Sequence, residues 1–160
     1  MSLRKNYDQS TSNQPFKCVN CGETVEVTGF IGTHNRNHCP FCLWSKHVDI
    51  KPGDRAAECG GSMEPLGLTL KNSNEGAGKG EIMLIHECTV CGKVNINRIA
   101  ADDDPKTILK VFENSLLPDI QSISGKLSQQ NIKLLSKTDT TEVTTQLFGN
   151  SKGGTTGSML

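Results

Sequence analysis

The chain has 160 residues and a formal net charge of zero, with 34% hydrophobic and only 4% aromatic residues. These values exclude a large core over the whole length, because globular domains usually contain roughly 45–50% apolar residues. They also exclude a strongly basic body that would bind nucleic acid through its overall charge, since residues 14–105 carry nine basic and twelve acidic side chains. No apolar run approaches the about 20 residues of a membrane span.

The first 14 residues are polar and contain no apolar stretch of the kind found in secretory signals. We therefore expect residues 1–14 to be disordered and the protein to be cytoplasmic. The chain contains seven cysteines, six of which form close Cys-x-x-Cys pairs. In a chain without an export signal, this pattern favours zinc over disulfides.

The first two pairs predict a zinc ribbon within residues 15–58. Cys18 and Cys21 precede a short alternating strand around residues 24–27, and the chain then returns to Cys39 and Cys42. Two such turns, separated by about 15–20 residues, are typical of a closed site with four cysteine ligands. A thin core combined with this motif predicts a fold that depends on metal.

Residues 59–118 predict a second hairpin followed by a helix. Residues 66–70 alternate in polarity and residues 82–85 form a short apolar run, so we expect two strands joined by a tip at 71–80. A further strand is predicted over 94–98. An amphipathic helix of about three turns is predicted from Pro105, with Pro118 at its end.

Residues 119–160 are rich in Ser, Thr, Gln, Gly and Lys, with scattered Ile and Leu, and end in a low-complexity stretch. We expect this segment to be mostly disordered. The predicted fold class is thus a small metal-stabilised, mostly β protein. It comprises two zinc-ribbon-like units with short hairpins, one C-terminal amphipathic helix and disordered tails.

The remaining cysteines, Cys59, Cys88 and Cys91, predict a second zinc site that needs a fourth ligand, for which histidine is the natural choice. We favour His47, which the chain can bring to this site. His86 is the alternative, although strand neighbours two residues apart lie roughly 6–7 Å from each other. A water ligand, or no second metal, also remains open. Two Zn²⁺ ions are expected in all.

A different use of the first pair is a finger with two cysteines and two histidines, formed by Cys18, Cys21, His34 and His38. This finger requires a helix over residues 26–38, where two glycines and several β-branched and Asn residues disfavour one. It would also leave the second cysteine pair unused, so the four-cysteine site is the better interpretation.

The sequence Arg36-Asn37-His38-Cys39-Pro40 resembles the motif that names the RNHCP domain family, and the likeness extends over about residues 16–105. Further residues that carry it are Cys42, Leu43, Ser45, His47, Val48, Asp49, Gly53, Asp54, Arg55, Cys59, Met63, Pro65, His86, Cys88, Cys91, Gly92, Asn97 and Arg98. The resemblance implies a small bacterial domain of the zinc-ribbon type. It implies no defined activity, and a fold alone does not supply one.

The metal sites themselves argue against catalysis. Catalytic zinc keeps an open coordination position, whereas four thiolates close the first site. We therefore expect a non-enzymatic protein. A zinc-dependent nuclease is a remote alternative, in which Arg36 would hold a phosphate and His38 would act as a base. The simpler role of His38 is to orient a metal ligand or the backbone.

A binding module is the expected function. Arg36, Trp44, Lys46 and Arg55 lie close in sequence to the second cysteine pair, and this cluster suggests contact with RNA or the ribosome. Trp44 could equally be a core residue or a lid over the metal. The alternative is a protein–protein adaptor without nucleic-acid contact, built on the rigid zinc scaffold.

Overall fold

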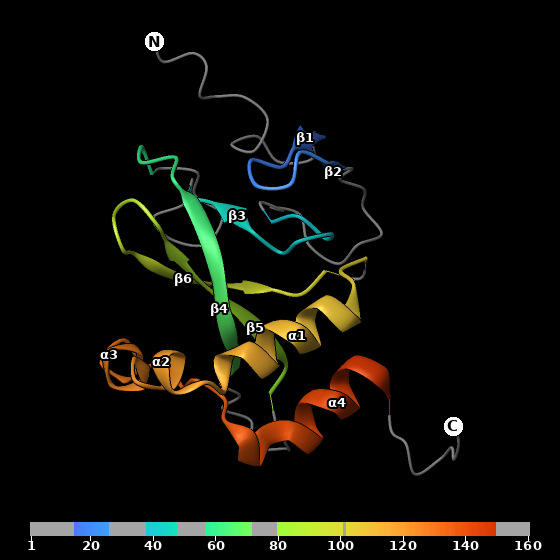
Figure 1. The fold of residues 1–160 in the computed structure, drawn as a ribbon, viewed down its shortest axis with the longest axis vertical. Helices are drawn as coiled ribbons and strands as arrows, with labels where there is room; N and C mark the ends of the chain where they lie inside the picture. The colour runs from blue at the N-terminus through green and yellow to red at the C-terminus, as the bar shows by residue number, and fades with distance from the viewer. Residues whose placement is uncertain (1–14, 26–37, 48–56, 72–79, 101, 150–160) are drawn as a thin grey trace.

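The structure is a computed structural model that describes residues 15–25, 38–47, 57–71, 80–100 and 102–149 (Figure 1). The N-terminal residues 1–14 and most of the expected hairpin tip, 72–79, lie outside the described residues, so the predictions made for them stay predictions. As the sequence predicted, the strands lie in two antiparallel sheets and one longer helix follows them, but the short helices after that helix were not predicted.

The first sheet is a two-stranded hairpin of β1 (Phe16–Lys17) and β2 (Thr24–Val25), paired with Phe16 opposite Val25. Phe16 and Val25 are buried against Cys18 and Cys39 in a cluster of four residues. A hairpin with so small a core is not stable alone in water. Its stability must therefore come from another source, and the adjacent cysteines provide one.

The second sheet has four strands in the order β3-β4-β5-β6, with every neighbouring pair antiparallel. The strands are β3 (Ser45–Lys46), β4 (Ser62–Leu70), β5 (Ile82–Cys88) and β6 (Val94–Arg98). The predicted hairpin and third strand are therefore present. β3 belongs to the first expected ribbon, residues 15–58, and β4 to the second unit, residues 59–118. Because the two strands pair, both units contribute to one sheet.

The central strand β5 is buried on both faces, as its continuous apolar run predicted. On one face, Leu84 packs with Ile108 and Phe112 of helix α1 (Pro105–Ser115). On the other face, Ile85 packs with Leu127 from the C-terminal segment. The helix predicted from Pro105 is present, and its buried residues lie four and three positions apart on one side.

The expectation of a mostly disordered segment from residue 119 is wrong for residues 119–149. These residues form α2 (Pro118–Gln121), α3 (Ser124–Ser128), the 3₁₀ helix η3 (Lys137–Asp139) and α4 (Thr140–Phe148). Figure 1 shows α4 running beside α1, with α2 and α3 at the end of the sheet. Residues 150–160 lie outside the described residues.

Packing and hydrogen bonds fasten this C-terminal segment to the sheet. Leu127 and Leu135 are fully buried. The backbone N–H of Leu135 donates to the carbonyl of Leu68 at 2.9 Å, which extends the pairing of β4. The Gln146 side chain accepts from the N–H of Ile82 and donates to the carbonyl of Gly80, each at 2.9 Å. The segment is thus part of the folded body.

No helix among the described residues is both long enough and apolar enough to cross a membrane.

Candidate metal centres

The first and third Cys-x-x-Cys turns have the same backbone geometry. The N–H of Gly22 donates to the carbonyl of Cys18, and the N–H of Gly92 donates to that of Cys88, both at 3.0 Å. Both glycines have a φ near +80°, in the left-handed region that residues with a side chain rarely adopt. Glycine directly after the second cysteine therefore closes each turn without strain.

The second turn places Leu43 where the other two have glycine. Its φ is +68°, and a single left-handed residue with a side chain costs about 1–2 kcal/mol. Leu43 is fully buried in the core formed by the sheet and α1. Its carbonyl also accepts a hydrogen bond from Nε2 of His86 at 2.6 Å. Core packing and this bond offset the strain, and they attach the second turn to the sheet.

The first candidate site brings together Cys18, Cys21, Cys39 and Cys42. The Sγ atoms of Cys18 and Cys42 lie 3.6 Å apart, and those of Cys21 and Cys39 lie 3.7 Å apart. Backbone N–H groups also point at sulfur, with Asn20 donating to Cys18 at 3.3 Å. These are the four residues that the spacing predicted.

The second candidate site brings together His47, Cys59, Cys88 and Cys91. The Sγ atoms of Cys59 and Cys88 lie 3.6 Å apart, and Nδ1 of His47 lies 3.4 Å from Sγ of Cys91. The site forms at one end of the four-stranded sheet, where β3 ends, β4 begins and β5 ends. The favoured histidine, His47, is therefore the one at this site.

The distances in both groups match a tetrahedral zinc shell. With zinc–sulfur bonds of about 2.3 Å, neighbouring sulfurs lie about 3.8 Å apart, and a sulfur and a histidine nitrogen lie about 3.5 Å apart. Within each group all ligand atoms lie within 4.8 Å of one another. All seven cysteines are free of disulfides. The protein thus carries two separate zinc sites.

The acidity of the thiols also fits a bound cation. Burial raises the pKa of the Cys39 thiol far above its usual value, only partly offset by backbone N–H groups. Burial also raises the pKa of Cys18, but hydrogen bonds from Cys21 and Asn20 outweigh it and the net pKa is lowered. The Cys39 thiol therefore ionises at neutral pH only if a positive charge lies beside it. A divalent zinc ion supplies that charge.

Close packing shapes the second site further. A Cβ added to Gly61 would lie 2.7 Å from Val90 and 2.9 Å from the sulfur of Cys88. Such contacts are shorter than side chains tolerate, so glycine is required there for the strand to approach the metal ligands. The N–H of His47 donates to the Gly61 carbonyl at 2.9 Å, which positions the histidine beside it.

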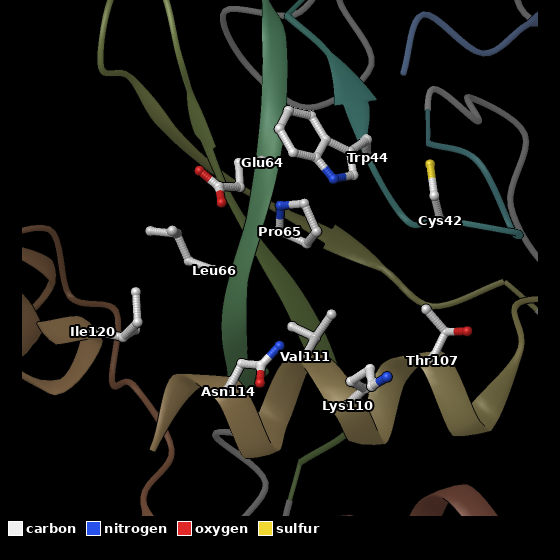
Figure 2. A pocket seen from close by; sticks show the side chains of 10 residues that line it. All are labelled: Cys42, Trp44, Glu64, Pro65, Leu66, Thr107, Lys110, Val111, Asn114 and Ile120. Carbon is white, nitrogen blue, oxygen red and sulfur yellow. The ribbon is translucent and has the colours of Figure 1, made fainter. Parts of the chain in front are cut away.

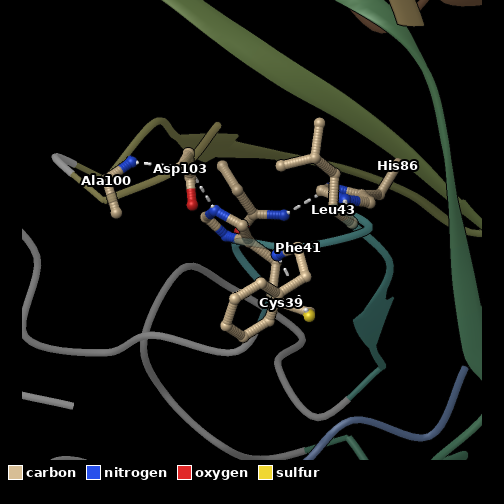
Figure 3. A network of polar contacts seen from close by, with 8 residues as sticks. Cys39, Phe41, Leu43, His86, Ala100 and Asp103 are labelled. Carbon is tan, nitrogen blue, oxygen red and sulfur yellow. Dashed lines mark hydrogen bonds and ion pairs between the residues drawn. The ribbon is translucent and has the colours of Figure 1, made fainter. Parts of the chain in front are cut away.

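A buried polar network lies behind the second cysteine turn (Figure 3). Nε2 of His38 lies 2.7 Å from Oδ2 of Asp103, and both side chains are almost completely buried. The same carboxylate oxygen accepts the N–H of Ala100 at 2.8 Å. The network fastens the turn to the loop before α1. Within this network His38 is 2% exposed and holds the turn through its contact with Asp103.

His86 belongs to this network and not to a metal site. Its Nε2 donates to the Leu43 carbonyl, and its Nδ1 lies 2.9 Å from the side-chain nitrogen of Asn97. Burial, with a smaller contribution from the charge of His38, lowers the pKa of His86 to about 3. His86 is therefore neutral at physiological pH, donating through one nitrogen and accepting through the other.

A comparison with sequence models of protein families shows to which family this chain belongs. Residues 13–109 match the sequence model of the RNHCP domain, which is more than half of the chain. The chain belongs to the RNHCP domain family. A search of curated proteins and a search of solved structures each found no significant match. In this RNHCP protein, the His and Cys of the naming motif are respectively a buried network residue and a ligand of the first zinc site.

Two of the four predicted nucleic-acid contacts lie among the described residues. Trp44 and Lys46 are half-buried, next to the second cysteine turn of the RNHCP domain. Arg36 and Arg55 lie outside the described residues. Trp44 forms one wall of a cavity of about 290 Å³ between the sheet and α1 (Figure 2). Its other lining residues are Cys42, Glu64, Pro65, Leu66, Thr107, Lys110, Val111, Asn114 and Ile120.

Two features of the protein surface were missed by sequence reasoning. Phe41 is exposed at the tip of the second cysteine turn, as are Val19 and Val90 on the other two turns. Lys110 and Asn114 bring polar groups from α1 to the cavity beside Trp44. Their spacing of four residues on a predicted helix was the available signal. Nothing in the sequence indicated that this helix faces Trp44.

Proposed function

We propose that this RNHCP protein is a non-enzymatic zinc module that binds single-stranded RNA, free or within the ribosome. The cavity beside Trp44 carries the proposal. It combines the only tryptophan of the chain with the ammonium group of Lys110. An indole stacks on the face of any base, and a lysine neutralises a neighbouring phosphate.

Helix α1 supports the proposal through its polar stripe. Lys106, Lys110 and Asn114 lie at intervals of four residues, so they share one side of the helix. Lys110 and Asn114 line the cavity directly, and Figure 2 shows them extending toward it from below Trp44. The amide of Asn114 and the carboxylate of Glu64 are groups that hydrogen-bond base edges.

The first zinc site supports the cavity mechanically. The N–H of Cys39 donates to the carbonyl of Trp44 at 2.9 Å, so a metal ligand holds the backbone that carries the indole. Closed sites of this kind act as scaffold, which is why we assign no catalytic role. Seven free thiols with no disulfide favour the reducing cytoplasm as the compartment.

The test uses Trp44 as its own reporter. Zinc-loaded protein is titrated with a short single-stranded oligoadenylate at several salt concentrations, and quenching of tryptophan fluorescence is measured. We expect quenching that weakens as salt rises. Lys110→Ala should lower the slope of log affinity against log salt by about 0.7, the value for one phosphate contact on a single strand. Lys133→Ala is the matched control and should leave the slope unchanged.

A second measurement, fluorescence anisotropy of a labelled oligoadenylate, allows Trp44 to be replaced. We expect Trp44→Ala to weaken binding by about 1–3 kcal/mol and Trp44→Phe to weaken it less, because phenylalanine keeps a stacking surface. The proposal would be overturned if the protein does not bind the oligoadenylate at low salt. It would also be overturned if the affinity changes neither with salt concentration nor on replacement of Trp44.

The alternative function is a protein–protein adaptor, and a separate observation favours it. Val19, Phe41 and Val90 are 49%, 56% and 71% exposed, and each sits on a rigid cysteine turn. Exposed apolar side chains on a fixed scaffold suit a protein partner as well as an RNA base. If the oligoadenylate titration shows no binding, the protein–protein adaptor becomes the better-supported function.

A further inference from the structure

We propose that the free edge of strand β6 is a docking site for an extended segment of a partner protein, in which an apolar residue is flanked by acidic ones. β6 is the last strand of the four-stranded sheet. The cavity beside Trp44 is near β3 and β4, at the opposite edge. The inference is therefore independent of the proposed RNA contact.

The backbone of β6 offers a regular row of hydrogen-bonding groups. The N–H of Cys88 donates to the carbonyl of Lys93 at 2.8 Å, which fixes the phase of the β5–β6 ladder. Because backbone groups alternate in direction along a strand, those of Val94, Ile96 and Arg98 point away from β5. Among the described residues, no backbone group bonds to these three positions on the outer side.

The opposite edge of the sheet is protected, and the contrast identifies β6 as the accessible edge. Along β4, strand β3 covers one end, and the N–H of Leu135 bonds to Leu68 near the other. Between them stand Pro65, which has no N–H, and a break in register. β6 has a continuous register over its five residues and contains no proline or bulge. Natural sheets usually protect an exposed edge with a proline, a bulge or a covering segment.

A cavity beside this edge can receive a side chain. A space of about 270 Å³ lies between the strand, from Val94 to Asn97, and residues 130–132 of the C-terminal segment. Ile96 and Ile132 both pack on the apolar cluster that contains Ile85, so its inner wall is apolar. A strand added beside β6 would lie about 4.8 Å away, and every second side chain would face this wall.

The charges around the edge set the character of the partner. Lys93 precedes the strand, Lys133 follows Ile132, and both are exposed without an ion pair among the described residues. Arg98, at the far end of the strand, lies 3.4 Å from Glu81 in a pair that is open to solvent. Glu87 on β5 is already paired with Lys126 at 2.9 Å. The charged groups near this edge that have no ion pair among the described residues are therefore positive. We accordingly assign acidic residues to both sides of the apolar residue in the partner segment.

Inward contacts hold β6 in place as a template. The side-chain nitrogen of Asn97 lies 2.9 Å from Nδ1 of His86, and that of Asn95 contacts the sulfur of Met63 at 3.8 Å. Through these contacts the side chains of Asn95 and Asn97 hold β6 against the rest of the sheet. A preorganised strand loses little freedom on binding, which favours addition of a partner strand.

The test is an NMR titration of isotope-labelled, zinc-loaded protein with a synthetic peptide of alternating glutamate and valine. The amide signals of Val94, Ile96 and Arg98 should shift. The same peptide with N-methyl groups along one backbone edge should not shift them, because its side chains remain but its hydrogen bonds are lost. No shift at millimolar peptide, or equal shifts with both peptides, would overturn the proposal.

Two variants separate the edge from its charge. Arg98→Pro removes an outward N–H and should weaken peptide binding about threefold to tenfold, the usual effect of one hydrogen bond. Arg98→Ala keeps that N–H and should weaken binding less. Both should retain two zinc ions. Two other outcomes would overturn the proposal: self-association of the chain through β6, and shifts of these amides by oligoadenylate but not by the peptide.

Discussion

The β1–β2 hairpin, within residues 15–25, and the segment of residues 118–149 both have few apolar residues apart from cysteine, yet they are held in different ways. In the first, the buried cluster consists of Phe16, Val25 and two metal ligands, so metal must supply most of the stability. In the second, leucines and a valine insert into clusters built by the sheet and α1. A short segment therefore folds either by binding an ion or by completing a core that already exists.

The largest expected effect is loss of a metal ligand. Cys39→Ser should reduce the zinc content from two ions per chain to one, because a three-thiolate shell binds zinc much more weakly. Structural zinc contributes about 10–16 kcal/mol in small zinc domains, so the β1–β2 hairpin should unfold. Native mass spectrometry measures the zinc content.

The second site has its own matched pair of variants. His47→Ala should also leave one zinc ion, whereas His86→Gln should keep two, because His86 bonds the Leu43 carbonyl and Asn97. The opposite pattern of zinc loss would show that the ligand has been assigned to the wrong histidine.

Shortening a side chain in the C-terminal segment should have a smaller effect, with no loss of metal. Leu127 is fully buried, so Leu127→Ala should lower the free energy of unfolding by about 2–5 kcal/mol while both zinc ions stay bound. Leu117 is 56% exposed, and Leu117→Ala should change stability by about 0.5 kcal/mol or less. Urea unfolding measures both. Equal effects of the two changes would contradict the packing described for this segment.

Protonation of His86 in β5, which bonds the Leu43 carbonyl and Asn97, should show a small effect, and only in acid. The pKa of His86 falls from 6.5 to about 3 on folding, so between these values the unfolded chain binds a proton that the folded chain does not. Stability is therefore lost as the pH falls below 6.5. The loss from this group is about 2 kcal/mol at pH 5.

His86→Gln provides the comparison, because glutamine can donate and accept in the same places without titrating. Urea unfolding at pH 7 and pH 5, with zinc content checked at each, should show a loss that is about 2 kcal/mol smaller in the variant. An unchanged pH dependence would mean that His86 is protonated within the fold or is not buried.

The sequence predicted the metal ligands well because a Cys-x-x-Cys turn is a local pattern whose chemistry does not depend on the rest of the fold. Counting the ligands left one vacancy at the second site, and His47 was favoured because His86, two residues before Cys88 on a strand, would lie too far from a shared ion. The pairing of His38 with Asp103 could not be predicted, since the two residues are 65 positions apart. The same holds for Leu43, whose left-handed backbone is acceptable only because its side chain fills the core.

The C-terminal segment was mispredicted for a related reason. Its composition is that of a disordered chain, and Leu127, Leu134, Leu135 and Val143 show no regular period. Each packs on a surface created by β4, β5 or α1, so the information for its folding lies outside the segment. A composition rule therefore fails where a folded partner surface is supplied by the same chain.

Hydrogen exchange before and after removal of zinc tests most directly the claim that metal holds one region and packing the other. We predict that the amides of Cys18 and Gly22, which bond within the first cysteine turn, lose protection when zinc is removed. The amides of Leu127 and Leu135 should keep theirs, because packing secures them. Simultaneous loss of protection at all four positions, or no loss at the cysteine turns, would contradict the account.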